Sequence, residues 1–531
     1  MTETELAALC AAITPPDEAA RAAAHAHWAS LAKPLGGLGG LETTIEDAAA
    51  LTGSAKLDIS RRAVLVLCAD NGVVAQGVSQ TDSSVTRAVA ENLAARRTSV
   101  CRMAQTARCE VVPVDMGIAG DPVPGVLDCR IAPGTADFTL GPAMSRAEAV
   151  EAIGRGIRLV QEQKKAGVGL LATGEMGIGN TTTSSAVAAV LLGQPVEGMT
   201  GRGAGLSDEG LARKIDAIHR GIAKNQPDSA DALDVLAKLG GFDIAGLCGV
   251  FLGGALEGVP VLADGFISCV AALCAVRLCP AAAKAVFASH CSTEPAAKLV
   301  LDALNKKALI TAGLHLGEGT GAVAAIPLWD MALAVYDGCY SFEEGGIEAY
   351  TPQGGCGMLT LVLGGAASGK SAYAESLVLK TGLPRYYLAT MQVWDAECAA
   401  RVEKHRKMRA QKQFETLECP LHLDRLALPG RGTVLLEDLG NLVANELYSP
   451  GGAGKHTAEA VLAGLERLAA GCDHLIVVSN EVFSGGANYA GDTDQYLLAL
   501  AQVNNAFAAR ADNVCRVVCG LPVYYKGGEK L

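Results

Sequence analysis

The sequence predicts an α/β protein with two domains, each built on a doubly wound, mostly parallel sheet. The first observation is length, because 531 residues exceed what a single hydrophobic core usually contains. The second is composition: aromatic residues make up only 4% of the chain while glycine occurs 62 times, which favours closely packed layers of small side chains. The third is that apolar runs alternate with alanine-rich helical stretches throughout, the pattern of parallel strands covered by helices.

The first domain is predicted to span residues 1–353. Its apolar runs each end in polar or glycine residues before a helical stretch begins. The expected strands are 63–69, 110–114, 168–172, 259–263 and 285–288, and the turns after them begin at Asp70, Asp115, Thr173, Asp264 and Ser289. Because ligands of doubly wound sheets bind at the carboxyl ends of the strands, these turns should share one cleft. The apolar window 266–288 is interrupted by charged residues and a proline, so it predicts a buried helix and a strand rather than a membrane span.

Residues 354–357 are predicted to be a linker, and residues 358–531 a second domain with strands at 359–363, 385–389, 433–437, 474–479 and 514–519. Its first strand runs into a glycine-rich loop and then into a helix-forming stretch. The loop reads Gly364-Gly365-Ala366-Ala367-Ser368-Gly369-Lys370-Ser371. Strand, G-x-x-x-x-G-K-S and helix in this order are typical of P-loop NTPases, so this domain is predicted to bind a nucleoside triphosphate.

The loop residues suit phosphate chemistry. Backbone N–H groups can converge on phosphate oxygens, and Lys370 can reach the outer phosphates. Ser371 and Glu437, which ends the strand 433–437, are the predicted ligands of Mg²⁺. The alternative, a chance glycine-rich turn, does not account for the strand and helix on either side.

A second glycine-rich turn lies in the first domain. The segment 173–182 follows a predicted strand and opens a helix, so it can cradle a single phosphate without a P-loop lysine. The stretch 200–206, with Gly203, and Lys214 beyond it could complete the same pocket. The alternative is a tight connection between strand and helix with no ligand. That alternative would explain the glycines but not the carboxylate of Glu175 among them.

Glu318 is the candidate base of the first domain. It lies between Gly317 and Gly319, after Leu316, and precedes an apolar helix. Desolvation beside apolar residues raises the pKa of a carboxyl group, which makes it a competent base near neutral pH. A glutamate that only caps a helix start is the alternative from spacing alone.

A histidine helix is predicted in the second domain at residues 396–411. Arg401, His405 and Arg409 recur every four residues and therefore share one face. Neighbouring cations disfavour protonation of the imidazole, and they also attract phosphates, so His405 could attack a nucleotide phosphate. An exposed basic helix with an ordinary surface histidine is the alternative.

Bulk charge and cysteine usage narrow the functional classes. The formal net charge is -12 and Lys and Arg form no long block, which disfavours a nucleic-acid partner. The 17 cysteines lack C-x-x-C pairs and the N-terminus is acidic, so a reducing cytoplasm with free thiols is expected. His25 and His27 on an alanine-rich helix, and His290-Cys291 in the first cleft, are interpreted as bystanders.

Several ordered motifs give residues 10–353 a family resemblance. This part of the chain resembles nicotinate-nucleotide:dimethylbenzimidazole phosphoribosyltransferases. The motifs are Lys33-Pro34-Leu35-Gly36-Gly37-Leu38-Gly39, Ala69-Asp70-Asn71-Gly72-Val73, the run 174–182, Asp264-Gly265-Phe266, Ser292-Thr293-Glu294-Pro295 and Leu316-Gly317-Glu318-Gly319.

The resemblance implies phosphoribosyl transfer from nicotinate mononucleotide to 5,6-dimethylbenzimidazole, giving α-ribazole 5'-phosphate and nicotinate. The family's proton acceptor falls on Glu318. The positions that match its nucleotide- and base-binding residues are Thr81, Glu175, Met176, Gly177, Ile178, Asn180, Thr181, Gly203, Lys214, Asp264 and Ser292.

Residues 358–526 resemble the bifunctional adenosylcobinamide kinase and adenosylcobinamide-phosphate guanylyltransferase. The resemblance rests on the P-loop, Leu388-Ala389-Thr390, the histidine helix with Arg406 and Arg409, Glu418 and Glu437. It implies phosphorylation of adenosylcobinamide and then transfer of GMP from GTP through His405, with Lys370 and Mg²⁺ neutralising phosphate charge. Both halves would then serve late cobalamin assembly, with adenosylcobinamide and GTP or ATP as further substrates, and a homo-oligomer is expected.

Two other functions are compatible with the sequence. Departures from the family patterns at Val89, Ala410 and Phe414 would fit a nucleotide-sensing binding protein derived from these enzymes. The second domain could also be a small-molecule kinase without guanylyltransferase activity. The retained Lys370, Ser371, His405, Glu175 and Glu318 favour the bifunctional enzyme.

Overall fold

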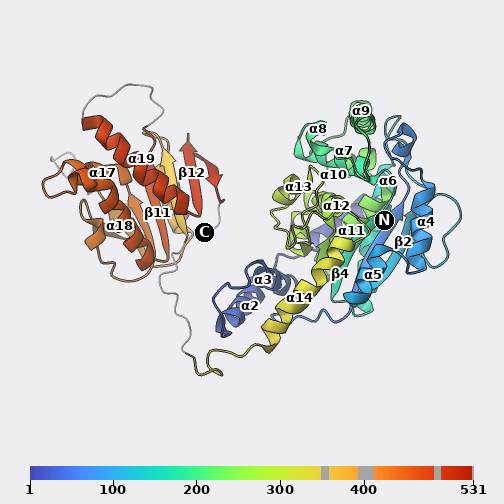
Figure 1. Ribbon diagram of the computed structural model, residues 1–531, viewed down its shortest axis with the longest axis horizontal. Coiled ribbons are helices and arrows are strands. Elements are labelled where there is room, and N and C mark those ends of the chain that lie inside the picture. Colours follow the sequence, from blue (N-terminus) through green and yellow to red (C-terminus); the bar gives the residue numbers. More distant parts are fainter. Residues whose placement is uncertain (348–357, 393–411, 483–491, 529–531) are drawn as a thin grey trace. The chain divides into compact units, whose positions relative to one another are not determined.

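The computed structural model describes residues 1–347, 358–392, 412–482 and 492–528. The chain divides into two compact units, Met1–Ala349 and Tyr350–Leu531, and each contains its own sheet (Figure 1). Across the described ranges, no helix has both the length and the apolar character needed to cross a lipid bilayer.

The first unit is built on a six-stranded sheet of order β3-β2-β1-β4-β5-β6, in which every pairing is parallel. The strands are β1 (Arg62–Ala69), β2 (Glu110–Gly117), β3 (Leu127–Asp128), β4 (Leu170–Met176), β5 (Val261–Ala263) and β6 (Val286–Ala288). The order reverses between β1 and β4, and doubly wound sheets bind ligands at the carboxyl ends of the strands near such a reversal. The predicted parallel, doubly wound fold is therefore confirmed here.

Strand β4 differs from its prediction in a way that affects the site. It extends to Met176, whereas the sequence placed the end of this strand at Ala172. Thr173, Gly174 and Glu175 pair in register with Leu65, Val66 and Leu67 of the central strand β1. Ladder hydrogen bonds to a buried neighbouring strand therefore override the turn preference of the glycine, and Glu175 projects from a strand rather than from a loop.

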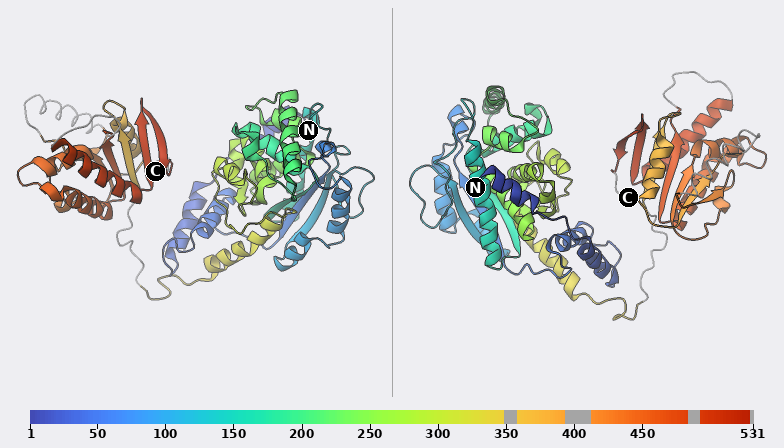
Figure 2. Two further views of the ribbon diagram at one scale, coloured as in Figure 1. Left: turned by 45° about the horizontal axis from the view of Figure 1, so that its top comes forward. Right: turned by 180° about the vertical axis from the view of Figure 1, so that it is seen from behind.

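Helices cover both faces of this sheet (Figure 2). Helices α6, α11 and α12 pack together on one side of β1 and β4, and α5 and α14 pack together against β2 and β4. All side chains from Ala63 to Ala69 of β1 are buried, as expected for the central strand of a sheet covered on both faces. The helices are α1 (Glu3–Ala11), α2 (Glu18–Ser30), α3 (Gly40–Thr52), α4 (Ser84–Ala94), α5 (Ser99–Thr106), α6 (Arg146–Lys165), α7 (Asn180–Leu192), α8 (Val196–Met199), α9 (Asp208–Asn225), α10 (Ala232–Leu239), α11 (Phe242–Glu257), α12 (Gly265–Leu278), α13 (Ala297–Ala303) and α14 (Thr320–Gly338), with 3-10 turns at Gly72–Gln76 and Pro280–Ala285.

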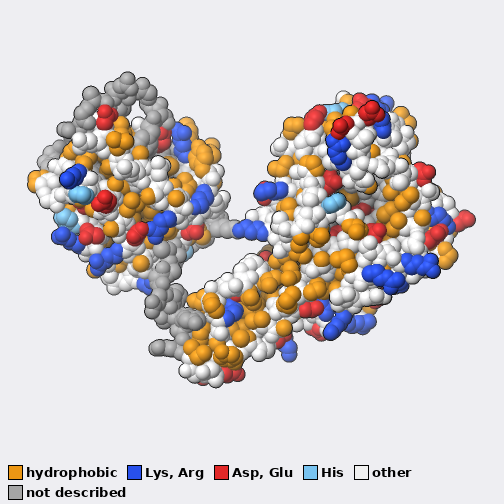
Figure 3. Space-filling view, in the orientation of Figure 1, with side chains coloured by type: hydrophobic (Ala, Val, Ile, Leu, Met, Phe, Trp, Pro, Cys, Tyr) orange, Lys and Arg blue, Asp and Glu red, His pale blue; other side chains and the backbone are white. Residues whose placement is uncertain are grey.

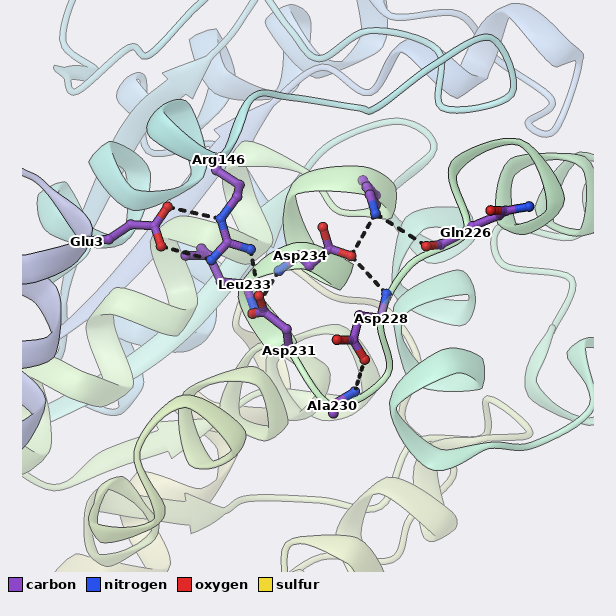
Figure 4. Close-up of polar contacts among 9 residues, drawn as sticks. Glu3, Arg146, Gln226, Asp228, Ala230, Asp231, Leu233 and Asp234 are labelled. Carbon is purple, nitrogen blue, oxygen red and sulfur yellow. Dashed lines mark hydrogen bonds and ion pairs between the residues drawn. The ribbon is translucent and has the colours of Figure 1, made fainter.

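A polar network ties the N-terminal helix α1 to the body of the unit (Figure 4). Both carboxylate oxygens of Glu3 accept hydrogen bonds from Arg146, each 2.9 Å long. The same guanidinium donates to Asp231 at 2.6 Å, and Asp231 in turn caps the start of α10. A cavity of about 550 Å³ beside the network is lined partly by Arg146, Asp234 and Lys238. Arg146 is engaged by the network, and Lys238 pairs with Asp234.

Helices α2, α3 and the end of α14 form a small helical lobe. The Trp28 and Tyr336 rings meet edge to face with centroids 4.9 Å apart, and Trp28 is 1% exposed. His25 and His27 lie on α2 as predicted, and they contact the Glu46 carboxylate and the Tyr336 carbonyl at 2.9 and 2.7 Å. These two histidines therefore help to hold the lobe together.

The second unit contains a seven-stranded sheet of order β13-β12-β7-β11-β10-β8-β9, parallel except for the β12–β13 hairpin. The strands are β7 (Leu359–Gly364), β8 (Arg385–Ala389), β9 (Phe414–Glu418), β10 (Thr433–Glu437), β11 (His474–Asn480), β12 (Asn513–Val518) and β13 (Leu521–Lys526), and the helices are α15 (Lys370–Leu379), α17 (Leu439–Tyr448), α18 (Thr457–Gly471) and α19 (Asp492–Arg510), with 3-10 turns at Leu423–Arg425 and Gly454–His456. The predicted mostly parallel sheet is confirmed. The edge strands β9 and β13 were not predicted, and both are partly exposed to solvent.

Candidate active sites

A cavity of about 270 Å³ lies at the carboxyl ends of β4, β5 and β6 in the first unit. It brings together most of the residues proposed from the sequence for nucleotide binding. These are Glu175, Met176, Gly177, Ile178, Asn180, Thr181, Gly203, Asp264 and Ser292, with Glu318 in the same lining. The expectation that the turns after the strands share a cleft is therefore met for β4, β5 and β6, whereas the turns predicted to begin at Asp70 and Asp115 do not line this cavity.

Close contact joins the carboxyl end of β4 to the segment that carries Glu318. A Cβ atom on Gly174 would lie only 2.6 Å from the Glu318 carbonyl oxygen, and one on Gly317 only 2.9 Å from Glu175 Oε1. Glu318 itself has φ of 58°, between Gly317 and Gly319 at 87° and 89°. Such a left-handed run strains a non-glycine residue, and strain of this kind is often found at functional sites.

The carboxyl group of Glu318 is half-buried. Burial raises its pKa, while the Val100 N–H and the Thr98 hydroxyl at the start of α5 lower it, and the negative charge of Asp264 raises it further. Among the described residues, no donor reaches the buried Glu318 Oε2. A carboxylate whose pKa is raised, and whose Oε2 has no hydrogen-bond donor among the described residues, is suited to accept a proton.

Asp264 holds the Glu318 segment in place. It is 4% exposed and begins α12. Its Oδ2 accepts from the Gly319 N–H at 2.9 Å, and its Oδ1 accepts from the N–H groups of Gly321 and Ala322 at 2.8 and 3.0 Å. Both oxygens therefore point at the start of α14, and the contacts of Asp264 are those of a residue that positions its neighbour Glu318.

Glu175 is enclosed by other acidic groups. It is 8% exposed, and its Oε2 accepts a short hydrogen bond from the Asn180 amide. Burial, followed by the charges of Asp243 and Asp264, raises the pKa of Glu175 to about 8. Burial also raises the pKa of Asp243 to about 6. Sequence reasoning missed Asp243, because nothing along the chain shows that α11 begins beside the turn after β4.

Lys214 lies behind the cavity wall with no exposed surface. Its Nζ donates to Thr181 Oγ1 at 2.8 Å and to the Gly201 carbonyl at 3.0 Å, which links the two glycine-rich stretches. Burial lowers the pKa of Lys214 to about 8. Thr81, in contrast, is exposed and does not line the cavity.

His290, interpreted from sequence as a bystander, lines the cavity and is 4% exposed. Its Nδ1 lies 3.1 Å from Ser289 Oγ and 3.8 Å from Asp264 Oδ1. Glu294, Phe266 and Leu316 also line the cavity. A motif match for Ser292 and Glu294 was the only sequence signal near His290, and it did not assign the histidine a role.

The P-loop of the second unit has the expected geometry. It joins β7 to α15, and Gly369 and Ala367 have φ of 88° and 56°. Lys370 is 8% exposed and its Nζ donates to the Gly365 carbonyl at 3.2 Å. The Ser371 hydroxyl donates a short hydrogen bond to Glu437 Oε1. In the described part of the chain, Glu437 Oε2 is buried without a partner, and burial raises the pKa of this carboxyl to about 7.

Three further predicted residues meet at the carboxyl ends of the adjacent strands. Ala389 of β8 pairs with Glu437 of β10 and with Glu418 of β9, so the three lie side by side. The Thr390 hydroxyl donates to the carbonyls of Glu437 and Asp438 at 3.0 and 2.8 Å. Leu388 is fully buried in β8. His405, Arg401, Arg406 and Arg409 lie outside the described residues.

Both units thus place acidic and phosphate-binding groups in glycine-rich turns at the carboxyl ends of parallel strands, as nucleotide-dependent transferases do. Residues 13–347 match the family model of a phosphoribosyltransferase, and the chain belongs to that family. Residues 360–525 match the model of cobinamide kinase / cobinamide phosphate guanyltransferase. The chain is therefore a bifunctional enzyme that joins a phosphoribosyltransferase to a kinase and guanylyltransferase domain.

Named relatives cover the first unit. A nicotinate-nucleotide–dimethylbenzimidazole phosphoribosyltransferase from Acetivibrio thermocellus is 46% identical over 325 residues, which is 61% of this chain and 93% of the relative. One from a Roseiflexus species is 44% identical over 340 residues, 64% of this chain and 96% of the relative. The crystal structure of the corresponding enzyme from Thermus thermophilus is 38% identical, with a TM-score of 0.59, and the match covers 62% of this chain and 99% of the Thermus chain.

Proposed function

We propose that the first unit transfers the phosphoribosyl group of nicotinate mononucleotide to 5,6-dimethylbenzimidazole, giving α-ribazole 5'-phosphate and nicotinate. The observation that carries this proposal is that Glu318 and the glycine turn after β4 line one cavity. The names of the relatives describe this donor and this acceptor.

The chemistry needs one proton acceptor. The glycosidic bond breaks toward the pyridinium nitrogen of the donor, which leaves as neutral-ring nicotinate without a general acid. The unprotonated ring nitrogen of the acceptor forms a bond to C1' from the opposite face, and the proton on the other ring nitrogen passes to Glu318, whose raised pKa suits this task. Thr181, Gly203 and Ser292 line the cavity and, with the buried Lys214 behind Thr181, would hold the 5'-phosphate.

The test is nicotinate release from nicotinate mononucleotide by the full-length protein in the presence of dimethylbenzimidazole. Glu318→Gln should lower kcat by about a hundredfold or more, the usual scale of general-base catalysis. Glu209→Gln, at an exposed position in the first turn of α9, serves as the matched control and should keep the wild-type rate. An unchanged kcat in Glu318→Gln would remove this residue from the proposed role.

We propose that the second unit phosphorylates adenosylcobinamide and then transfers GMP from GTP to the product through a phosphoramidate on His405. The P-loop lysine and the paired Ser371 and Glu437 support binding of a triphosphate. Ser371 Oγ and the unpartnered Glu437 Oε2 are hard oxygen ligands next to each other, so they fit Mg²⁺. When bound, Mg²⁺ would neutralise charge on the phosphates, while Lys370 contacts the outer phosphate oxygens.

Incubation with GTP labelled at the α-phosphate tests the second step. The wild-type protein should become covalently labelled, and His405→Ala should not. His456→Ala, at an exposed histidine on the turn before α18, is the control and should label normally. Labelling that persists in His405→Ala would place the nucleophile elsewhere, and phosphorylation without labelling in the wild type would reduce the domain to a kinase.

We further propose a homo-oligomer that works in the cytoplasm. Large apolar side chains are exposed on and near the helical lobe, where Figure 3 shows hydrophobic side chains gathered: Met331 is 56% exposed and Tyr340 53%. Exposed apolar patches commonly mark protein interfaces. The described cysteines are free thiols, the state that a reducing compartment maintains. Light scattering on wild type and Met331→Glu tests this: a wild-type monomer would contradict it.

A further inference from the structure

His290 is built into the wall of the phosphoribosyl cavity. It follows β6, is only 4% exposed, and is wedged between two glycines. A Cβ atom on Gly321 would lie 2.0 Å from His290 Nδ1, and one on Gly265 would lie 3.0 Å from His290 Nε2. The start of α12 and the start of α14 therefore both leave space for this one ring.

The neighbouring hydroxyl group fixes the tautomer of His290. The single Ser289 hydroxyl proton is donated to the Ala263 carbonyl at 2.6 Å. The Ser289 oxygen can then only accept at its 3.1 Å contact with His290 Nδ1, so Nδ1 carries the proton. Asp264 Oδ1, 3.8 Å from the same nitrogen, favours this tautomer as well. It follows that Nε2 carries a lone pair and is a hydrogen-bond acceptor.

This acceptor has no partner among the residues that the structure describes. Burial lowers the pKa of His290, while Asp264 partly offsets the effect, so the ring stays neutral near pH 7. The carboxyl groups that line the cavity are those of Glu175, Asp264, Glu294 and Glu318. Asp264 approaches the Nδ1 side of the ring, and none of the four forms a hydrogen bond with Nε2 in the described part of the chain.

The donor nucleotide offers few groups that could satisfy Nε2. Its phosphate and its carboxylate are acceptors, and at neutral pH its hydroxyl groups are the donors. His290 lies between Ser292, on the side where the phosphate would bind, and the Gly321 end of the Glu318 segment. The ribose must lie between the phosphate and the reacting C1' atom.

We propose that His290 Nε2 accepts a hydrogen bond from a ribose hydroxyl group of the nucleotide donor and so fixes the sugar against Glu318. The inference rests on the proposed phosphoribosyl transfer and adds a specificity-determining residue to it. Ser289 and Asp264 act through His290 by holding its tautomer. A ribose fixed in this way presents C1' to the incoming base in one orientation, and such positioning lowers the barrier to reaction.

The test compares nicotinate mononucleotide with its 2'-deoxy and 3'-deoxy analogues in the wild-type protein and in two variants. An asparagine can replace Nδ1 but has no atom at the Nε2 position, whereas a glutamine can place its amide oxygen there. Wild type should prefer the ribonucleotide over one of the analogues in kcat/KM. In His290→Asn that preference should shrink about ten- to a hundredfold, the scale of a buried acceptor left unpaired, and His290→Gln should recover part of it. The intrinsic reactivity of each analogue cancels, because the same pair of substrates is compared in each protein.

His219→Gln is the control, because His219 lies on α9 outside the cavity lining and is exposed, with its Nε2 2.8 Å from Glu197 Oε1. It should keep the wild-type preference between substrates. The proposal would be overturned if the wild-type protein and His290→Asn preferred the ribonucleotide over each deoxy analogue by the same factor in kcat/KM. If wild type releases no nicotinate from the ribonucleotide itself, the proposed function fails instead.

A second measurement follows the NMR resonance of His290 Nε2 directly in the wild-type protein. In wild-type protein with 15N-labelled histidine, the unprotonated Nε2 resonance should shift upfield when nicotinate mononucleotide binds, and should shift less with the deoxy analogue that loses the contact. His290→Gln identifies the resonance by its loss. A resonance that stays unchanged while the nucleotide binds would refute the contact even if His290→Asn failed to fold.

Discussion

The three hydrogen bonds that Asp264 accepts from the start of α14 lead to a sharp prediction for Asp264→Asn. The carboxylate receives the N–H groups of Gly319, Gly321 and Ala322 at 2.8–3.0 Å, and it has almost no contact with solvent. An asparagine has the same shape but only one acceptor oxygen. With that oxygen on Gly321 and Ala322, its NH₂ group must face the Gly319 N–H, so donor meets donor.

The magnitude follows from the charge and from the mismatch. Hydrogen bonds to a charged group contribute about 1.5–3 kcal/mol each, against about 1 kcal/mol for neutral pairs, and an unmade buried bond costs more. Asp264→Asn removes the charge from two of the hydrogen bonds and abolishes the third. The attachment of residues 319–322 to position 264 should therefore weaken by about 2–4 kcal/mol. Because Glu318 is adjacent to Gly319, its carboxyl group should lose its fixed position, and misplacement of this kind costs about a hundredfold in rate.

Hydrogen–deuterium exchange of the peptide containing residues 317–323 measures this attachment directly. Since every 1.4 kcal/mol is a factor of ten, exchange in Asp264→Asn should be about 30- to 700-fold faster there. Asp302→Asn is the control, because this exposed carboxylate on α13 forms an ion pair with Lys298 one turn away and lies outside the cavity lining. Wild-type exchange together with wild-type nicotinate release in Asp264→Asn would refute the reasoning.

Three further predictions concern other parts of the two sites. Gly321→Ala should lower the free energy of unfolding of the first unit by about 1–3 kcal/mol, because the new methyl group would lie 2.0 Å from His290 Nδ1. Gly338→Ala, where no atom lies within 4 Å of the new methyl group, should leave the thermal melting temperature unchanged or raise it slightly. Burial lowers the pKa of Lys214 to about 8, so the ammonium group loses its proton as the pH rises through 8. The KM of the wild-type protein for nicotinate mononucleotide should therefore rise over this pH range. In Lys214→Met the KM should be high and should not change with pH. Glu437→Gln should raise the Mg²⁺ concentration needed for half-maximal GTP labelling by at least about tenfold, and Glu415→Gln, exposed on β9, should leave it unchanged.

The sequence predicted those parts of the site that depend on local pattern. The turn before α7, the Glu318 segment and the P-loop each combine glycines with a helix start, and each was expected from the sequence, although β4 shortens the first turn by extending to Met176. What the sequence could not predict depends on contacts between distant segments. Asp243 is buried and affects Glu175 only because α11 packs against β1 and β4, and His290 acquires a tautomer only from the Ser289 hydroxyl and the Ala263 carbonyl.

Where a strand ends also depends on contacts between distant segments, which the sequence does not show. The register of β4 against β1 carries Glu175 into the sheet, and this pairing joins residues that are distant along the chain. The edge strand β13 is more exposed than the central strands, with Leu521, Val523 and Tyr525 facing outward, and it contains Pro522. A proline within an apolar run argues against a strand, so a search for buried apolar runs finds the central strands and misses β13.

The electrostatics of the two sites match the charge that each reaction develops. In and behind the wall of the first cavity, Glu175, Asp243 and Glu318 all have raised pKa values, mainly because burial disfavours their ionised forms, and repulsion from neighbouring carboxylates raises the pKa values of Glu175 and Glu318 further. A cationic pyridinium donor and a C1' atom with oxocarbenium character would relieve that repulsion, so the cavity gains most from binding a substrate that is positive at its reacting centre. The second site instead places Lys370 where negative phosphate charge must be neutralised. Two transfers with transition states of opposite charge therefore require two separate pockets, which is a physical reason why the chain contains two complete sheets rather than one shared site.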